Sequence, residues 1–185
     1  ELLRKQLAEY TGAKHAFLMT SATTALWVCL KLLNIGKGDE VIVSDFSFPA
    51  TANVVEDLGA IPVFADVDIQ TFNMLPEELE KKINTRTKAV IFVDALGSPA
   101  GITKIKAICK KHGLPLIEDA ACGIGSAENG QRCGSVADLT CFSFHPRKLI
   151  SSGEGGAITT NRDDWADWFE TKLMHGAKGL KGIAM

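Results

Sequence analysis

The chain has 185 residues, of which 46% are hydrophobic and 23% are charged, as is ordinary for a water-soluble globular protein. Its 20 basic and 22 acidic residues give a formal net charge of −2, and no basic cluster alternates with aromatic residues, so a nucleic-acid-binding surface is not expected. The longest apolar runs are too short to cross a bilayer, and the start of the chain lacks the pattern of a signal peptide. We therefore expect one domain spanning 1–185, in a cytoplasmic protein without nucleic-acid or membrane partners.

Helical and strand-like patterns alternate along the sequence. Helices are predicted at 24–33, 49–58, 76–83, 102–112 and, capped by Asn161, up to residue 173. Strands are predicted at 41–43, 61–65, 88–94, 114–117, 139–144 and 157–160. The strands are short and almost continuously apolar, which is typical of a parallel sheet that helices cover on both faces. We predict an α/β fold with a mostly parallel sheet sandwiched between helices.

Five cysteines lie at positions 29, 109, 122, 133 and 141. Their number is odd and no two form a Cys-x-x-Cys pair, so the sequence predicts neither a disulfide framework nor a zinc site. We expect buried free thiols and no metal centre.

Ligands of such folds bind beyond the carboxyl ends of the strands, which directs attention to the segments that follow each strand. The stretch "MTSATTAL" at 19–26 is small and rich in hydroxyls immediately before a predicted helix, so its amides and the hydroxyls of Ser21, Thr23 and Thr24 could face a phosphate. A simple Ser/Thr helix cap explains the same stretch and, on this stretch alone, is the favoured interpretation. No Walker motif or dinucleotide fingerprint is present, which argues against a nucleoside triphosphate or NAD.

Three further segments with candidate site residues lie at the same edge of the predicted sheet. Glu118 and Asp119 end a buried strand, where a carboxylate is costly unless it meets a cation or hydrogen-bond donors. Phe48 is either a core residue or a flat surface for a ring, and Lys148 is either a solvated loop lysine or an amine nucleophile held in a glycine-rich loop. An anion cradle, a stacking ring, a buried carboxylate and a lysine are together what pyridoxal phosphate requires.

Four segments, at 36–68, 87–102, 112–126 and 141–161, resemble in wording and order the signature segments of the DegT/DnrJ/EryC1/StrS sugar aminotransferases, which have the type I aspartate aminotransferase fold. The resemblance implies that Lys148 binds pyridoxal phosphate covalently, that Asp119 pairs with its pyridine nitrogen and that Phe48 stacks on its ring. The matching phosphate contacts are Ala22, Thr23 and Ser143. Ala22 stands where the family commonly has glycine, and Cys122, beside the coenzyme, stands where it generally has Gln or His.

The resemblance also implies a function and an assembly. The expected enzyme transfers an amino group, with glutamate as donor, to a keto carbon of a nucleotide-linked sugar, in a homodimer whose subunits share active sites. The smaller C-terminal domain of the family is absent from this sequence, which begins with Glu1, so we expect a fragment of a longer chain. Three alternatives stay open: a sugar dehydratase with histidine in place of the lysine, a non-catalytic ligand-binding regulatory module of the same fold, and a generic α/β binding domain.

Overall fold

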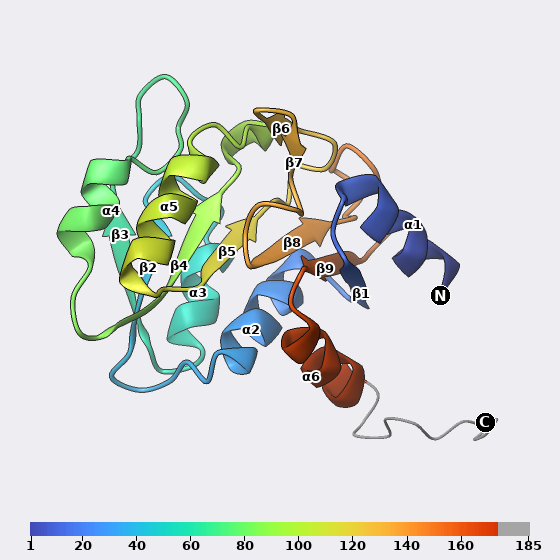
Figure 1. The fold of residues 1–185 in the computed structure, drawn as a ribbon, viewed down its shortest axis with the longest axis horizontal. Coiled ribbons are helices and arrows are strands. Elements are labelled where there is room, and N and C mark those ends of the chain that lie inside the picture. Colours follow the sequence, from blue (N-terminus) through green and yellow to red (C-terminus); the bar gives the residue numbers. More distant parts are fainter. Residues whose placement is uncertain (174–185) are drawn as a thin grey trace.

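A computed structural model describes residues 1–173, which form a seven-stranded sheet with the strand order β1-β9-β8-β5-β4-β2-β3 (Figure 1). The strands of this sheet are β1 (His15–Met19), β2 (Glu40–Ser44), β3 (Ile61–Ala65), β4 (Thr87–Val93), β5 (Leu116–Asp119), β8 (Leu139–Ser143) and β9 (Gly156–Thr160). Neighbours from β3 through β8 pair in parallel, and β9 is antiparallel to both β8 and β1. The predicted mostly parallel α/β sheet is confirmed.

Helices cover both faces of the sheet (Figure 1). They are α1 (Leu2–Thr11), α2 (Ala22–Leu32), α3 (Ala50–Glu56), α4 (Pro76–Lys82), the short 3-10 helix η1 (Ala95–Gly97), α5 (Ile102–His112) and α6 (Asp163–Leu173). Side chains alternate between faces along a strand, so Val41 and Val43 of β2 pack with α2 and α3, while Ile42 packs with α4 and α5. A strand covered on both sides must be apolar throughout, which explains the continuous hydrophobic runs of the sequence.

Two elements at the start of the chain, α1 and β1, were not predicted. The strand β1 has five residues and is only partly buried, so its sequence HAFLM carries no clear period of two. It joins the sheet through antiparallel pairing with β9, from His15 opposite Thr160 to Met19 opposite Gly156. That pairing depends on a segment about 140 residues away, which local patterns do not reveal.

Strand β5 lies two residues later than predicted. It runs over Leu116–Asp119 instead of 114–117, with Leu116 opposite Val90 of β4. Pro115, which has no N–H to donate, lies before the strand and only accepts a bond from the Val90 amide. The shift makes Glu118 and Asp119 the last two residues of the strand itself.

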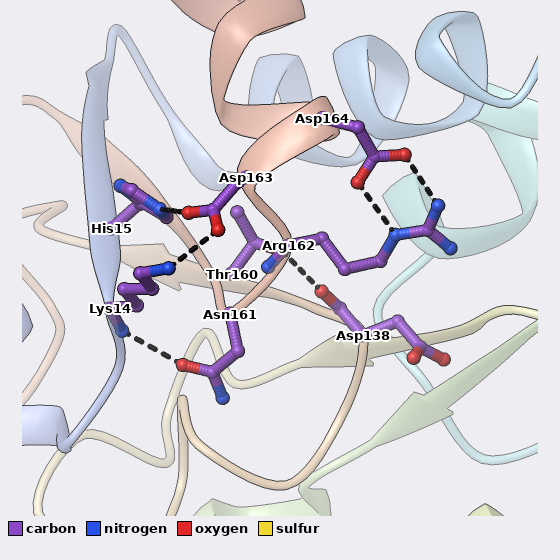
Figure 2. A network of polar contacts seen from close by, with 8 residues as sticks. All are labelled: Lys14, His15, Asp138, Thr160, Asn161, Arg162, Asp163 and Asp164. Carbon is purple, nitrogen blue, oxygen red and sulfur yellow. Dashed lines mark hydrogen bonds and ion pairs between the residues drawn. The ribbon is translucent and has the colours of Figure 1, made fainter.

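The prediction that Asn161 caps the last helix is wrong (Figure 2). Its Oδ1 accepts a hydrogen bond from the Lys14 amide at 2.8 Å, and α6 begins two residues later. The carboxylate of Asp163, in the first turn of α6, lies 2.6 Å from the Lys14 ammonium and 2.7 Å from the His15 ring. These contacts tie β1 to the segment that leads from β9 into α6.

Among residues 1–173, no helix is both long enough and apolar enough to cross a membrane.

Candidate active site

A cavity of about 300 Å³ lies beyond the carboxyl ends of β5 and β8, beside the start of α2. Its lining comprises Ser21, Ala22, Thr23, Leu26, Phe48, Ala50, Asp119, Ala121, Ser143, His145, Arg147, Lys148 and Glu154. Six of the seven residues predicted for the site therefore share one cavity, although they come from four separate segments of the chain. Cys122 does not line the cavity but contacts one of its members.

At the first turn of α2, the sequence left two alternatives, a helix cap and a phosphate site, and different groups suit each of them. Ser21 and Thr24 form a capping box, in which the Ser21 hydroxyl accepts from the Thr24 amide and the Thr24 hydroxyl accepts from the Ser21 amide, both at 3.1 Å. The cap interpretation is thus confirmed for these two hydroxyls. The amides of Ala22 and Thr23 lie in the first turn, where no intrahelical acceptor exists, and Ser143 adds a buried hydroxyl to the same cavity. This end of the cavity can hold an anion.

Gly156, the first residue of β9, lets the sheet approach the start of α2 closely. A Cβ added to it would lie 2.4 Å from the carbonyl carbon of Ser21 and 2.7 Å from the nitrogen of Ala22. Real Cβ atoms do not tolerate such distances, so only glycine fits here without displacing the first turn of α2. Gly156 therefore fixes where the free amides point.

We expect Gly156→Ala to destabilise the fold by about 1–3 kcal/mol, because the methyl group meets backbone that must move. Urea unfolding followed by circular dichroism measures the loss. Gly36→Ala is the matched control, since its added Cβ would have no neighbour closer than 4.0 Å, and we expect a change within about 0.5 kcal/mol. Equal stabilities of the two variants would contradict the tight contact.

Asp119 is the buried carboxylate of the cavity, with 6% of its surface exposed. Its Oδ2 accepts a hydrogen bond from the Thr51 hydroxyl at 2.8 Å, and its Oδ1 accepts a longer one from the Ala121 amide at 3.3 Å. Burial raises the pKa of Asp119, while these two bonds and the positive charge of Lys148 oppose that rise. The carboxylate is thus held in a fixed orientation and stands ready for a cationic hydrogen-bond donor.

Glu118, which could equally have met a cation, points elsewhere. Its Oε2 accepts from the Thr140 hydroxyl at 2.6 Å and from the Gly134 amide at 3.1 Å. Consecutive residues of a strand face opposite sides, so only one of the two carboxylates can reach the cavity. The structure assigns that position to Asp119.

Lys148 follows β8 in a tight turn, where its amide donates to the His145 carbonyl at 2.9 Å. Lys148 lines the cavity, and its side-chain nitrogen donates to the Cys122 sulfur at 3.3 Å. Cys122 is exposed, whereas the other four cysteines are buried, so the expectation of buried thiols fails at this one position. A thiol beside the lysine amine is a weak hydrogen-bond partner, which leaves the amine free to react.

Phe48 lines the cavity with 73% of its surface exposed, so the core interpretation is wrong for this residue. Sequence reasoning missed one contributor, Thr51, which orients Asp119. Thr51 gave no signal beyond following Phe48 by three residues at the start of a helix. Arg147, in the segment 145–148 that the sequence indicated as part of the site, adds a cation to the lining.

The sequence of this chain is similar to those of known sugar aminotransferases. The model of the DegT/DnrJ/EryC1/StrS aminotransferase family matches residues 1–182. The chain belongs to this family. Among curated relatives, it is 46% identical to the UDP-N-acetyl-3-dehydro-alpha-D-glucosamine 3-aminotransferase of Acidithiobacillus ferrooxidans, over 85% of this chain and 43% of that protein. It is 44% identical to the GDP-perosamine synthase of Caulobacter vibrioides, over 88% of this chain and 44% of that protein.

Solved structures agree with the family assignment. A DegT/DnrJ/EryC1/StrS aminotransferase from Brucella abortus superposes with a TM-score of 0.90 at 39% identity, covering 99% of this chain and 51% of that one. The sheet and its helices are therefore those of the type I aminotransferase fold. The chain spans about half the length of the curated relatives it matches.

Proposed function

We propose that this chain is the coenzyme-binding domain of a longer pyridoxal-phosphate-dependent aminotransferase. The enzyme would move an amino group from an amino acid, with glutamate as the expected donor, to a keto group of a nucleotide-linked sugar. Family membership supports the reaction class, and the names of the relatives support a nucleotide sugar as substrate. Since two relatives of similar identity carry names with different nucleotides, GDP and UDP, the proposal stops at the substrate class.

The observation that carries the proposal is the convergence of three different chemical groups on one cavity. Free amides and a hydroxyl at one end suit the phosphate, the Asp119 carboxylate suits a protonated pyridine nitrogen, and the Lys148 amine suits the aldehyde carbon. These residues thus fit pyridoxal phosphate, on which members of the family depend. When bound, the coenzyme supplies an electron sink for charge that develops on the substrate carbon.

The residues of this chain contribute orientation and proton control. The Asp119 carboxylate favours a proton on a ring nitrogen next to it, and Thr51 keeps that carboxylate from rotating. The Lys148 Nζ is the group that can take a proton from a substrate carbon and return it, because Lys148 lines the cavity and its backbone is fixed by the turn at His145. Phe48, exposed at the same cavity, offers a face on which a ring can stack.

A visible absorption spectrum with added pyridoxal phosphate, followed by borohydride reduction and peptide mapping, tests the proposal. We expect a visible band and one reduced adduct, on Lys148. Absence of an adduct in the full-length protein, or an adduct spread over surface lysines, would instead favour the non-catalytic binding module.

The sugar-dehydratase alternative requires a histidine in the role of Lys148, and His145 is the only histidine of the cavity lining. Its ring, however, is engaged in its own turn: Nδ1 accepts from the Arg147 amide at 3.2 Å, and Nε2 lies 3.9 Å from Glu154. The amine of Lys148 takes part in none of the ion pairs found among residues 1–173. This difference favours the aminotransferase.

A homodimer is the assembly we propose for the full-length enzyme. An apolar groove of about 540 Å³ runs between α1 and the loop after Lys148, lined among others by Leu3, Tyr10, Leu149 and Ile150. Leu149, the neighbour of Lys148, is 78% exposed, so a second subunit seated there would border the active site. Analytical ultracentrifugation of the full-length protein should find a dimer, and a monomer would contradict the proposal.

The cytoplasmic location of the protein stays a prediction.

A further inference from the structure

Three acidic groups that the proposed reaction does not use meet in the core, next to the segment that carries Asp119. Asp94 follows β4, Glu118 belongs to β5, and Cys133 lies between β7 (Gln131–Arg132) and β8. Each is at most 2% exposed, and one oxygen of each carboxylate and the Cys133 sulfur lie within 4.8 Å of one another. No spacing in the sequence predicted this cluster, because its members come from three separate segments.

The cluster has fewer hydrogen-bond donors than its four carboxylate oxygens need. Thr140 and Gly134 serve one oxygen of Glu118, whereas its other oxygen and both oxygens of Asp94 have no partner among the described residues. None of the ion pairs in residues 1–173 involves Asp94 or Glu118. The Cys133 thiol is a weak donor and can serve one oxygen at a time. If both buried carboxyl groups were ionised here, their two negative charges would strongly destabilise the folded protein.

We propose that Asp94 and Glu118 share a single proton at neutral pH and act together as positioning residues for Asp119. One proton removes one of the two charges and supplies the missing donor between the two carboxyl groups. The donors from Thr140 and Gly134 keep Glu118 the better acceptor, so the proton resides on Asp94. The positioning role rests on the proposed function, whereas the shared proton does not.

Asp94 is joined to the active-site segment by backbone as well as by its side chain. Its amide donates to the carbonyl of Asp119 at 3.1 Å. Its carboxyl packs on Gly123, in the turn that follows Asp119, so closely that a Cβ there would lie 2.1 Å from the Asp94 Oδ2. A change of charge or of side-chain position at Asp94 therefore acts directly on the segment that carries Asp119 and Cys122.

Burial and the neighbouring carboxylates favour retention of the proton, whereas the Cys133 thiol opposes it. Burial, and then the charge of Glu118, raises the pKa of Asp94, and Asp119 adds to the same effect. Burial raises the pKa of Glu118 as well. Burial raises the pKa of the facing Cys133 thiol as well, so it stays neutral and contributes no competing charge.

Infrared difference spectroscopy of the wild-type full-length protein tests the proton directly. We expect the C=O stretching band of a protonated carboxylic acid at neutral pH, and its loss or shift in both Asp94→Asn and Glu118→Gln. Asp57→Asn, which changes an exposed carboxylate, is the control and should leave the band unaltered. The wild-type spectrum decides the question even if a variant fails to fold, since absence of the band overturns the proposal.

The pH dependence of stability gives a second, independent measurement. A carboxyl group whose pKa is raised by folding stabilises the protein fully below its unfolded pKa of about 4, and this contribution is lost as the pH rises through the folded pKa. Within that window the unfolding equilibrium constant of the wild type should rise about tenfold per pH unit relative to Asp94→Asn. Parallel pH profiles, or one equivalent of a divalent metal found by elemental analysis of the purified protein, would overturn the shared proton.

Discussion

Lys148→Ala is expected to abolish covalent attachment of pyridoxal phosphate and to lower aminotransferase activity by at least about 10³-fold. The amine is lost from the one position in the described chain where it shares a cavity with Asp119 and the first turn of α2. Stability should change by less than about 0.5 kcal/mol, because Lys148 is only half-buried and its side chain makes a single weak hydrogen bond, to Cys122. Borohydride trapping with mass spectrometry, thermal unfolding and a transamination assay measure the three quantities.

Lys110→Ala is the matched control for this variant. Lys110 is an exposed lysine in the last turn of α5, on the covering layer of helices and outside the cavity. The control should keep both the adduct and the activity. If Lys148→Ala retained a stoichiometric covalent adduct, another lysine would be the reactive one, and the assignment of the site would fail.

The sequence predicted the elements whose signals are local. Helix α5 was predicted at 102–112 and has these bounds, because its apolar period is regular and Gly113, with φ of 67°, stops it where only a residue tolerant of left-handed backbone fits. Strand β9 was predicted at 157–160 and begins one residue earlier. By contrast, β1 was missed because its place at the edge of the sheet is decided by pairing with β9.

The candidate site divides in the same way. Lys148 and Asp119 were expected to converge because both follow strands whose carboxyl ends meet at one edge of the sheet, and they do share a cavity. Thr51 was missed because the bond that orients Asp119 joins residues 68 positions apart. The pairing of Asp94 with Glu118 was missed for a related reason: it depends on how β4 and β5 pair, and the bounds predicted for β5 were two residues too early.

Asp119→Asn is the variant that separates coenzyme binding from chemistry. The substitution keeps the size of the side chain and an oxygen that can accept from Thr51, but removes the negative charge. Without that charge a proton on the adjacent ring nitrogen is no longer favoured, so we expect activity to fall by about 10²- to 10⁴-fold. Coenzyme affinity should fall less, by about tenfold to a hundredfold, since one charge-assisted hydrogen bond contributes about 1.5–3 kcal/mol.

The two losses are expected to differ because the first turn of α2, which we propose as the phosphate site, and the amine of Lys148 do not depend on Asp119. Equilibrium titration of the coenzyme and steady-state kinetics on the same preparation measure them side by side. Thr51→Val serves as the matched control, because it removes the hydroxyl that orients the carboxylate while leaving its charge, and should give an intermediate loss of activity. If affinity and activity fell together in Asp119→Asn, with a lower melting temperature, the carboxylate would be a structural group, and the electron-sink role of the site would have to rest on another residue.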